Sequence, residues 1–140
     1  MTTTPFTLEI REGRLLEGRI RSPIAPPDVR AFMERLRFLL GGLNGRKVAI
    51  VTELLQADVF PADVANAFLS VMKTDNPLVE RSAFLIGESA MFGMQVEKLI
   101  REAGHPARRT FRDATALEAW LGEILGPSER ARLKAFLTLK

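Results

Sequence analysis

The chain has 140 residues, of which 46% are hydrophobic and 26% are charged, a composition typical of one globular domain. It contains no cysteine, which excludes disulfides and thiolate chemistry, and it has a single histidine. Its 20 basic and 17 acidic residues leave a net charge of +3, a surplus too small to favour nucleic acid as a partner. No apolar run is long enough to cross a membrane, and the first ten residues lack a signal-peptide pattern, so we expect a cytoplasmic protein.

The chain begins with two strand patterns and a helix pattern. Apolar residues stand at every second position of Phe6–Ile10 and Leu16–Ile20, which predicts two strands joined by a turn at Glu12-Gly13. Three prolines follow, and then apolar residues recur at helical spacing from Pro27 to Leu40. The first third of the chain therefore predicts a β-hairpin followed by an amphipathic helix.

The segment Lys47–Thr52 contains the run Val-Ala-Ile-Val, which is apolar on both alternations. This pattern predicts a strand covered on both faces, as in a parallel sheet. A loop over 53–60 and a helix over Pro61–Met72 should follow it. The strand is thus expected to be central in the fold.

The second half of the chain repeats the strand-then-helix pattern. Ser89 and Asp113 each precede a helical apolar stripe, and we expect both side chains to cap a helix N-terminus. The elements expected here are a strand over 82–86, a helix over 90–103, a short strand over 107–111, a helix after 113 and a last helix over 128–139. The order β-β-α-β-α-β-α-β-α-α predicts an α/β fold with a mixed, mostly parallel sheet begun by an N-terminal β-hairpin, with helices packed on it. We expect one domain over 1–126 and a C-terminal helical extension over 127–140.

The element order, with the segments VAIVTELLQADVFPADVANAFLSVMKTDNP, VERSAFLIGES and REAGHPARRTFRDATALEAWL, resembles the SpoIIAA-like branch of the STAS fold from about Phe6 to Leu125. In regulatory members of that family, the loop after the central strand and the start of the next helix face a partner kinase, and a serine there is phosphorylated. The matching segment, Gln56–Asp63, has no serine or threonine, so we do not expect the phosphoserine switch. What the resemblance does imply is a docking surface for a protein partner, formed by Val59, Phe60, Pro61 and Asp63.

The chain offers few residues for catalysis. Ser89 lies between a strand and a helix, but Met91 stands where a nucleophile elbow requires glycine, so the capping role is favoured. His105 precedes a proline in a turn, where a structural role is favoured. Glu53, Glu88 and Ser89 fall at the carboxyl ends of strands, where a ligand crevice is an alternative to ordinary solvated loop positions. We therefore expect no catalytic residue, no metal site, no cofactor and no enzyme activity.

The leading hypothesis is a non-catalytic cytoplasmic regulatory module that binds a protein partner without the phosphoserine switch. The alternative is a small-molecule or lipid-binding domain, because many large apolar side chains could line a cavity. The residues that suggest such a cavity are Phe32, Met33, Phe68, Met72, Phe84, Phe92 and Met94. The last helix carries Leu133, Phe136 and Leu137, where a homodimer contact could form.

Overall fold

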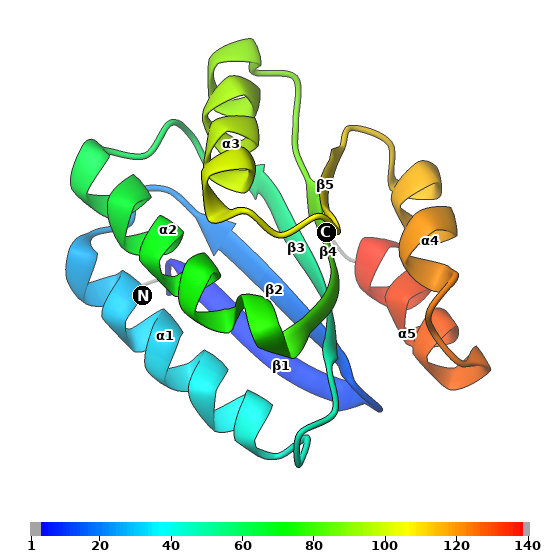
Figure 1. The fold of residues 1–140 in the computed structure, drawn as a ribbon. Helices are drawn as coiled ribbons and strands as arrows, with labels where there is room; N and C mark the ends of the chain where they lie inside the picture. The colour runs from blue at the N-terminus through cyan, green and yellow to red at the C-terminus, as the bar shows by residue number, and fades with distance from the viewer. Residues whose placement is uncertain (1–3, 139–140) are drawn as a thin grey trace.

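The strands follow one another across a single sheet in the order of the sequence, β1-β2-β3-β4-β5 (Figure 1). We describe residues 4–138 of a computed structural model. β1 pairs antiparallel with β2, and all the later pairs are parallel. The strands are β1 (Phe6–Glu12), β2 (Leu15–Arg21), β3 (Val48–Gln56), β4 (Val79–Leu85) and β5 (Arg108–Phe111). This is the mixed, mostly parallel sheet that the sequence predicts.

Helices cover both faces of the sheet. α1 (Pro26–Gly41), α2 (Ala62–Asp75) and α3 (Ala90–Ala103) join successive parallel strands and share one face, because each right-handed crossover moves the chain the same way across the sheet. A 3₁₀ turn, η1 (Asn76–Leu78), connects α2 to β4. α4 (Ala114–Gly122) and α5 (Pro127–Thr138) lie on the opposite face. Among residues 4–138 no helix is long and apolar enough to cross a membrane.

β3 is the central strand and is buried on both faces, as its apolar run predicts. Val48 and Ile50 belong to the core beneath α1, α2 and α3, whereas Ala49 and Val51 belong to the core beneath α4 and α5. Successive side chains of a strand point to opposite faces, so one short run supplies both cores. The strand continues beyond the predicted end at Thr52 as far as Gln56, because its last residues still pair with the end of β2.

α5 is an integral part of the second core. Leu133 and Phe136 are 0% and 4% exposed, and burying two such side chains contributes about 3 to 6 kcal/mol to the packing of α5. Arg132 on α5 donates two hydrogen bonds, of 2.6 and 2.8 Å, to the buried carboxylate of Glu17 on β2. The side chains of Leu133 and Phe136 are therefore taken up within this chain, and Leu137 is partly buried against the same core. A homodimer contact through this helix stays a prediction. Residues 139 and 140, at the end of the predicted helix, lie outside the described part.

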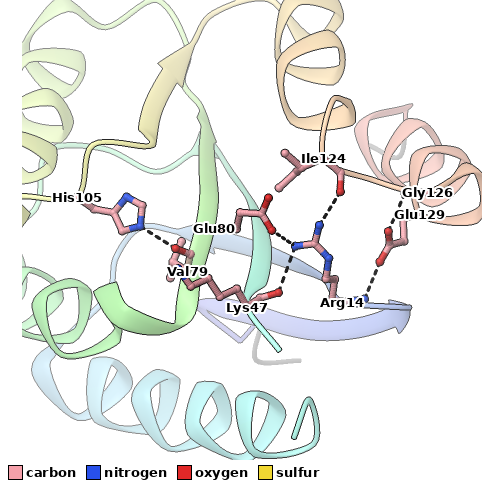
Figure 2. Close-up of polar contacts among 8 residues, drawn as sticks. All are labelled: Arg14, Lys47, Val79, Glu80, His105, Ile124, Gly126 and Glu129. Atoms are coloured by element: carbon pink, nitrogen blue, oxygen red, sulfur yellow. Dashed lines mark hydrogen bonds and ion pairs between the residues drawn. The ribbon is translucent and has the colours of Figure 1, made fainter. Parts of the chain in front are cut away.

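A second set of contacts ties the β1–β2 turn to the segment between α4 and α5 (Figure 2). The backbone N–H of Arg14 donates to one carboxylate oxygen of Glu129 at 2.8 Å, and that of Gly126 donates to the other at 2.9 Å. The Arg14 guanidinium also donates to Glu80 and to the backbone carbonyls of Lys47 and Ile124. The hairpin and the C-terminal helices are thus joined at both the turn and the strand.

Several local predictions are confirmed. Ser89 accepts a hydrogen bond from the Phe92 N–H and caps α3, and Asp113 accepts from two N–H groups and caps α4. The helix predicted over 90–103 ends at Ala103, and Gly104 follows it in the left-handed conformation with φ 79°. β4 begins at Val79, three residues before its predicted start, because Val79 pairs with Val48 of β3.

Candidate functional site

The loop between β3 and α2 is held against α3 by one side chain. The amide oxygen of Gln95 accepts a hydrogen bond from the Phe60 N–H at 2.8 Å, and the Gln95 amide nitrogen donates to the Phe60 carbonyl at 2.8 Å. Both halves of a side-chain amide are therefore used on the backbone of one loop residue. This pair brings the end of β3 and the first turns of α3 together at the carboxyl edge of the sheet.

Phe60 is an anchor of this loop and not part of its outer surface. Its side chain is 6% exposed, and its ring lies 5.2 Å from that of Phe68 and 5.3 Å from that of Phe92, measured between centroids. The sequence placed Phe60 in the docking surface, and its burial corrects that placement. Val59, Pro61 and Asp63, the other three residues of that surface, are exposed, and docking through them stays a prediction.

Four large apolar side chains are exposed at this edge, and together we call them the edge patch: Leu55, Val59, Met91 and Met94, which are 53%, 43%, 73% and 69% exposed. Leu55 is the last residue but one of β3 and lies beside Gly87 of the loop that leads to α3. Met91 stands four residues before Gln95, so its side chain lies on the same face of α3 as the Gln95 side chain that binds the loop. Several exposed apolar side chains at one edge of a sheet mark an interaction surface more often than isolated ones do.

Acidic side chains surround the edge patch. Asp58 and Asp63 are exposed on the loop and at the start of α2, and Glu88 is exposed just before α3. The nearby basic residue Arg112 is engaged, because its guanidinium donates to the Gly87 carbonyl. The edge therefore presents apolar side chains together with exposed carboxylates, of which those of Asp58 and Asp63 accept hydrogen bonds from the Val59 and Val64 N–H groups.

The residues of the predicted ligand crevice have separate surroundings. The Glu53 carboxylate forms an ion pair with Arg19 at 3.2 Å and accepts a hydrogen bond from the Leu55 N–H at 3.1 Å. Ser89 caps α3, and Glu88 is exposed. Within residues 4–138, no group of three Asp, Glu or His side chains could hold a metal ion. The predicted use of Glu53, Glu88 and Ser89 as a ligand crevice stays a prediction.

His105 has a structural role. Its Nδ1 accepts a hydrogen bond from the Ala107 N–H at 2.9 Å, and its Nε2 lies 2.7 Å from the Val79 carbonyl oxygen (Figure 2). A carbonyl oxygen only accepts, so Nε2 carries the proton and the ring is the neutral tautomer. Both nitrogens are thus used to join the start of β4 to the turn after α3, which is the structural role favoured from the sequence.

A cavity of about 80 Å³ lies between the sheet and the helices α1, α2 and α3. Of the seven residues that suggested a cavity, Phe32, Phe68, Met72 and Phe84 line it. Phe92 is buried elsewhere in the same core, Met33 is partly buried against that core, and Met94 belongs to the edge patch. The aromatic side chains are therefore mainly core residues, and the space they leave is small.

An N-terminal hairpin, parallel strands in sequence order and helices α1 to α3 on one face define a SpoIIAA-like fold. A solved structure from Shewanella loihica PV-4, described as an uncharacterized protein from the DUF3478 family with a SpoIIAA-like fold, aligns with a TM-score of 0.66. The alignment covers 86% of this chain and 97% of that one at 13% sequence identity, so the likeness is one of fold. No protein-family sequence model and no curated protein sequence matches the chain.

Sequence reasoning missed Gln95, Met91 and Met94 as parts of this site. Gln95 is 35 positions away from its partner Phe60, and a helical glutamine carries no local sign of such a contact. Met91 and Met94 did carry a signal, because they fall outside the buried stripe of α3. Large apolar residues on the polar face of an amphipathic helix indicate an interaction surface, and this pattern is present in the sequence.

Proposed function

We propose that the protein is a non-catalytic module that binds a protein partner through the edge patch. The observation that carries this proposal is the exposure of four large apolar side chains around a loop that is itself held in place by Gln95. A surface that is already ordered loses little conformational entropy on binding, which favours affinity. The SpoIIAA-like fold supports the proposal, because the corresponding edge is the one expected to face a partner in the resembling regulators.

The charges at the edge indicate the chemistry of the partner. Three exposed carboxylates, those of Asp58, Asp63 and Glu88, stand around apolar side chains. A complementary protein surface would present apolar anchors with Lys or Arg beside them. Methionine side chains adapt their shape to such anchors, since they are unbranched and polarizable. Binding would not depend on phosphorylation of the loop, because residues 56–63 contain no serine or threonine.

The test is capture of the partner from the native host with the wild-type chain, a patch variant and a matched control. The patch variant Val59→Ser/Met91→Ser removes two exposed apolar side chains and should reduce partner recovery at least tenfold. The control, Phe38→Ser, removes an apolar side chain of α1 that is 73% exposed, as Met91 is, and should leave recovery unchanged. All three proteins should melt alike, because surface substitutions change the free energy of unfolding by about 0.5 kcal/mol or less.

Equal recovery by the patch variant and the wild type would overturn the proposal. Loss of recovery with both the patch variant and Phe38→Ser would also overturn it, because the effect would then follow general surface hydrophobicity. A charge variant, Asp58→Asn/Glu88→Gln, tests the chemistry of the partner. Its binding should be weaker than that of the wild type at low salt and should depend less on added salt.

A further inference from the structure

Three polar or charged side chains line one part of the cavity, whereas the rest of its lining is apolar except for Thr52. Asp75 comes from the end of α2, Ser82 from β4 and Arg108 from the start of β5, and they are 6%, 0% and 6% exposed. These three side chains, which we call the polar end, meet the same space as Phe68, Phe84 and other core residues. Charged and hydroxyl groups are rarely buried without partners, so their arrangement calls for a physical reason.

Two atoms of the polar end have no hydrogen-bond partner among residues 4–138: Asp75 Oδ2 and Ser82 Oγ. An unpartnered buried polar atom costs about 1 to 3 kcal/mol. Arg108, by contrast, is well held, because its guanidinium donates to Asn76 Oδ1 at 3.0 Å and to the Met72 carbonyl at 3.1 Å. The carboxyl and the hydroxyl are therefore the groups that remain available to a bound molecule.

The charges of the polar end select a neutral bound group. Burial raises the pKa of the Asp75 carboxyl, while the charges of Arg108 and Arg37 oppose that rise. Burial also lowers the pKa of Arg108 to about 10, and the charge of Asp75 opposes this fall in pKa. One carboxylate and one guanidinium balance each other, so a charged ligand would add a buried charge with no counterpart.

We propose that the cavity binds a small neutral molecule with a hydrocarbon body and one hydroxyl group. A hydroxyl donates one hydrogen bond and accepts others, so it can donate to Asp75 Oδ2 and accept from Ser82 Oγ at the same time. The hydrocarbon part would lie among the apolar lining residues. None of the four edge-patch residues lines the cavity, so its ligand can be tested separately from partner binding.

The volume limits the size of the ligand. An engineered apolar cavity of about 150 Å³ binds benzene, which has six non-hydrogen atoms. The cavity here, at about 80 Å³, is roughly half that size. In the same proportion it holds about three non-hydrogen atoms. It therefore suits a very short alcohol, and ethanol is a suitable probe.

The experiment is a titration of the full chain with ethanol, followed by amide chemical shifts and by nuclear Overhauser effects from the ligand methyl group. The wild type should show saturable binding, with contacts to Val71 and Leu99, which line the cavity. Ser82→Ala should weaken ethanol binding about five- to tenfold and leave xenon binding unchanged, because xenon needs only the apolar part. Ser70→Ala, at an exposed position of α2, is the matched control and should bind ethanol as the wild type does.

Three results would overturn the proposal. One is the absence of saturable shifts at cavity residues. Another is equal ethanol affinity in the wild type and in Ser82→Ala with both proteins folded, which the amide spectra report directly. The third is a long-lived water at Asp75 and Ser82 that ethanol does not displace, because the polar end would then be a hydration site.

Discussion

The contact between Gln95 and Phe60 can be tested with a substitution that changes one functional group. Gln95→Glu keeps the shape of the side chain and the oxygen that accepts from the Phe60 N–H. It replaces the amide nitrogen, which donates to the Phe60 carbonyl at 2.8 Å, with a second oxygen. At neutral pH that oxygen carries negative charge and faces the carbonyl oxygen, so an attractive contact becomes a repulsive one.

The size of the effect follows from these two contacts. A lost hydrogen bond costs about 0.5 to 1.5 kcal/mol, and leaving the half-buried carbonyl without a donor adds to this. We expect Gln95→Glu to lower the free energy of unfolding by about 2 kcal/mol at pH 7. For a domain of this length that corresponds to a fall in melting temperature of roughly 5 to 10 °C.

The stability penalty of Gln95→Glu should become smaller as the pH falls. The facing carbonyl raises the pKa of the introduced carboxyl above its value in the unfolded chain, near 4.3. The protonated carboxyl can donate to the carbonyl, so the stability lost by the substitution is recovered below pH 4.3 and lost again as pH rises through the folded pKa. Gln95→Ala, which removes both hydrogen bonds, should instead cost a similar amount at both pH values.

The assay is urea unfolding of the wild type and both variants at pH 4 and pH 7, with stability expressed relative to the wild type at each pH. The penalty of Gln95→Glu should be clearly smaller at pH 4 than at pH 7. A penalty of the same size at both pH values, or no penalty at pH 7, would refute the reasoning about the donated hydrogen bond.

Two further predictions concern the C-terminal helix. Arg132→Leu should lower the free energy of unfolding by about 3 kcal/mol, because it leaves a 4% exposed carboxylate unpaired. Glu17→Gln should lower it by only about 1 kcal/mol, because the guanidinium that loses its partner is partly exposed to water. Equal costs in urea unfolding would contradict this. Burial raises the pKa of Glu129, but hydrogen bonds from the Arg14 and Gly126 N–H groups outweigh it and lower the pKa from 4.5. The stability that Glu129 contributes is therefore present above pH 4.5 and lost as pH falls through its folded pKa; Glu129→Gln should flatten this acid dependence, and an unchanged pH profile would contradict it.

Much of the fold follows from local sequence patterns. The run over 48–51 specifies a central strand because β-branched and small apolar residues on both alternations suit burial on both faces. Ser89, Asp113 and Gly104 mark helix ends because their side chains or conformational freedom serve the end of a helix directly. These features depend on neighbours within a few residues, so the sequence alone predicts them.

The candidate site was less predictable because its contacts are distant in sequence. Phe60 stands in a polar loop next to proline, which suggests exposure, yet Phe68, Phe92 and Gln95 hold it inside. Outside this site, Glu17 alternates with apolar residues along β2, a pattern that suggests exposure to solvent. Its burial depends on Arg132, which is 115 positions away. Neither contact leaves a local pattern, since it forms only after helices and strands pack together.

The most direct test of partner binding at the edge patch is photo-crosslinking in the native host from a p-benzoylphenylalanine placed at Met91, compared with one placed at Phe38. The two positions are equally exposed, at 73%, but only Met91 belongs to the edge patch. We predict a covalent adduct with a specific protein at Met91, with Lys or Arg flanking the attached residue, and no such adduct at Phe38. The same set of adducts at both positions would contradict the account.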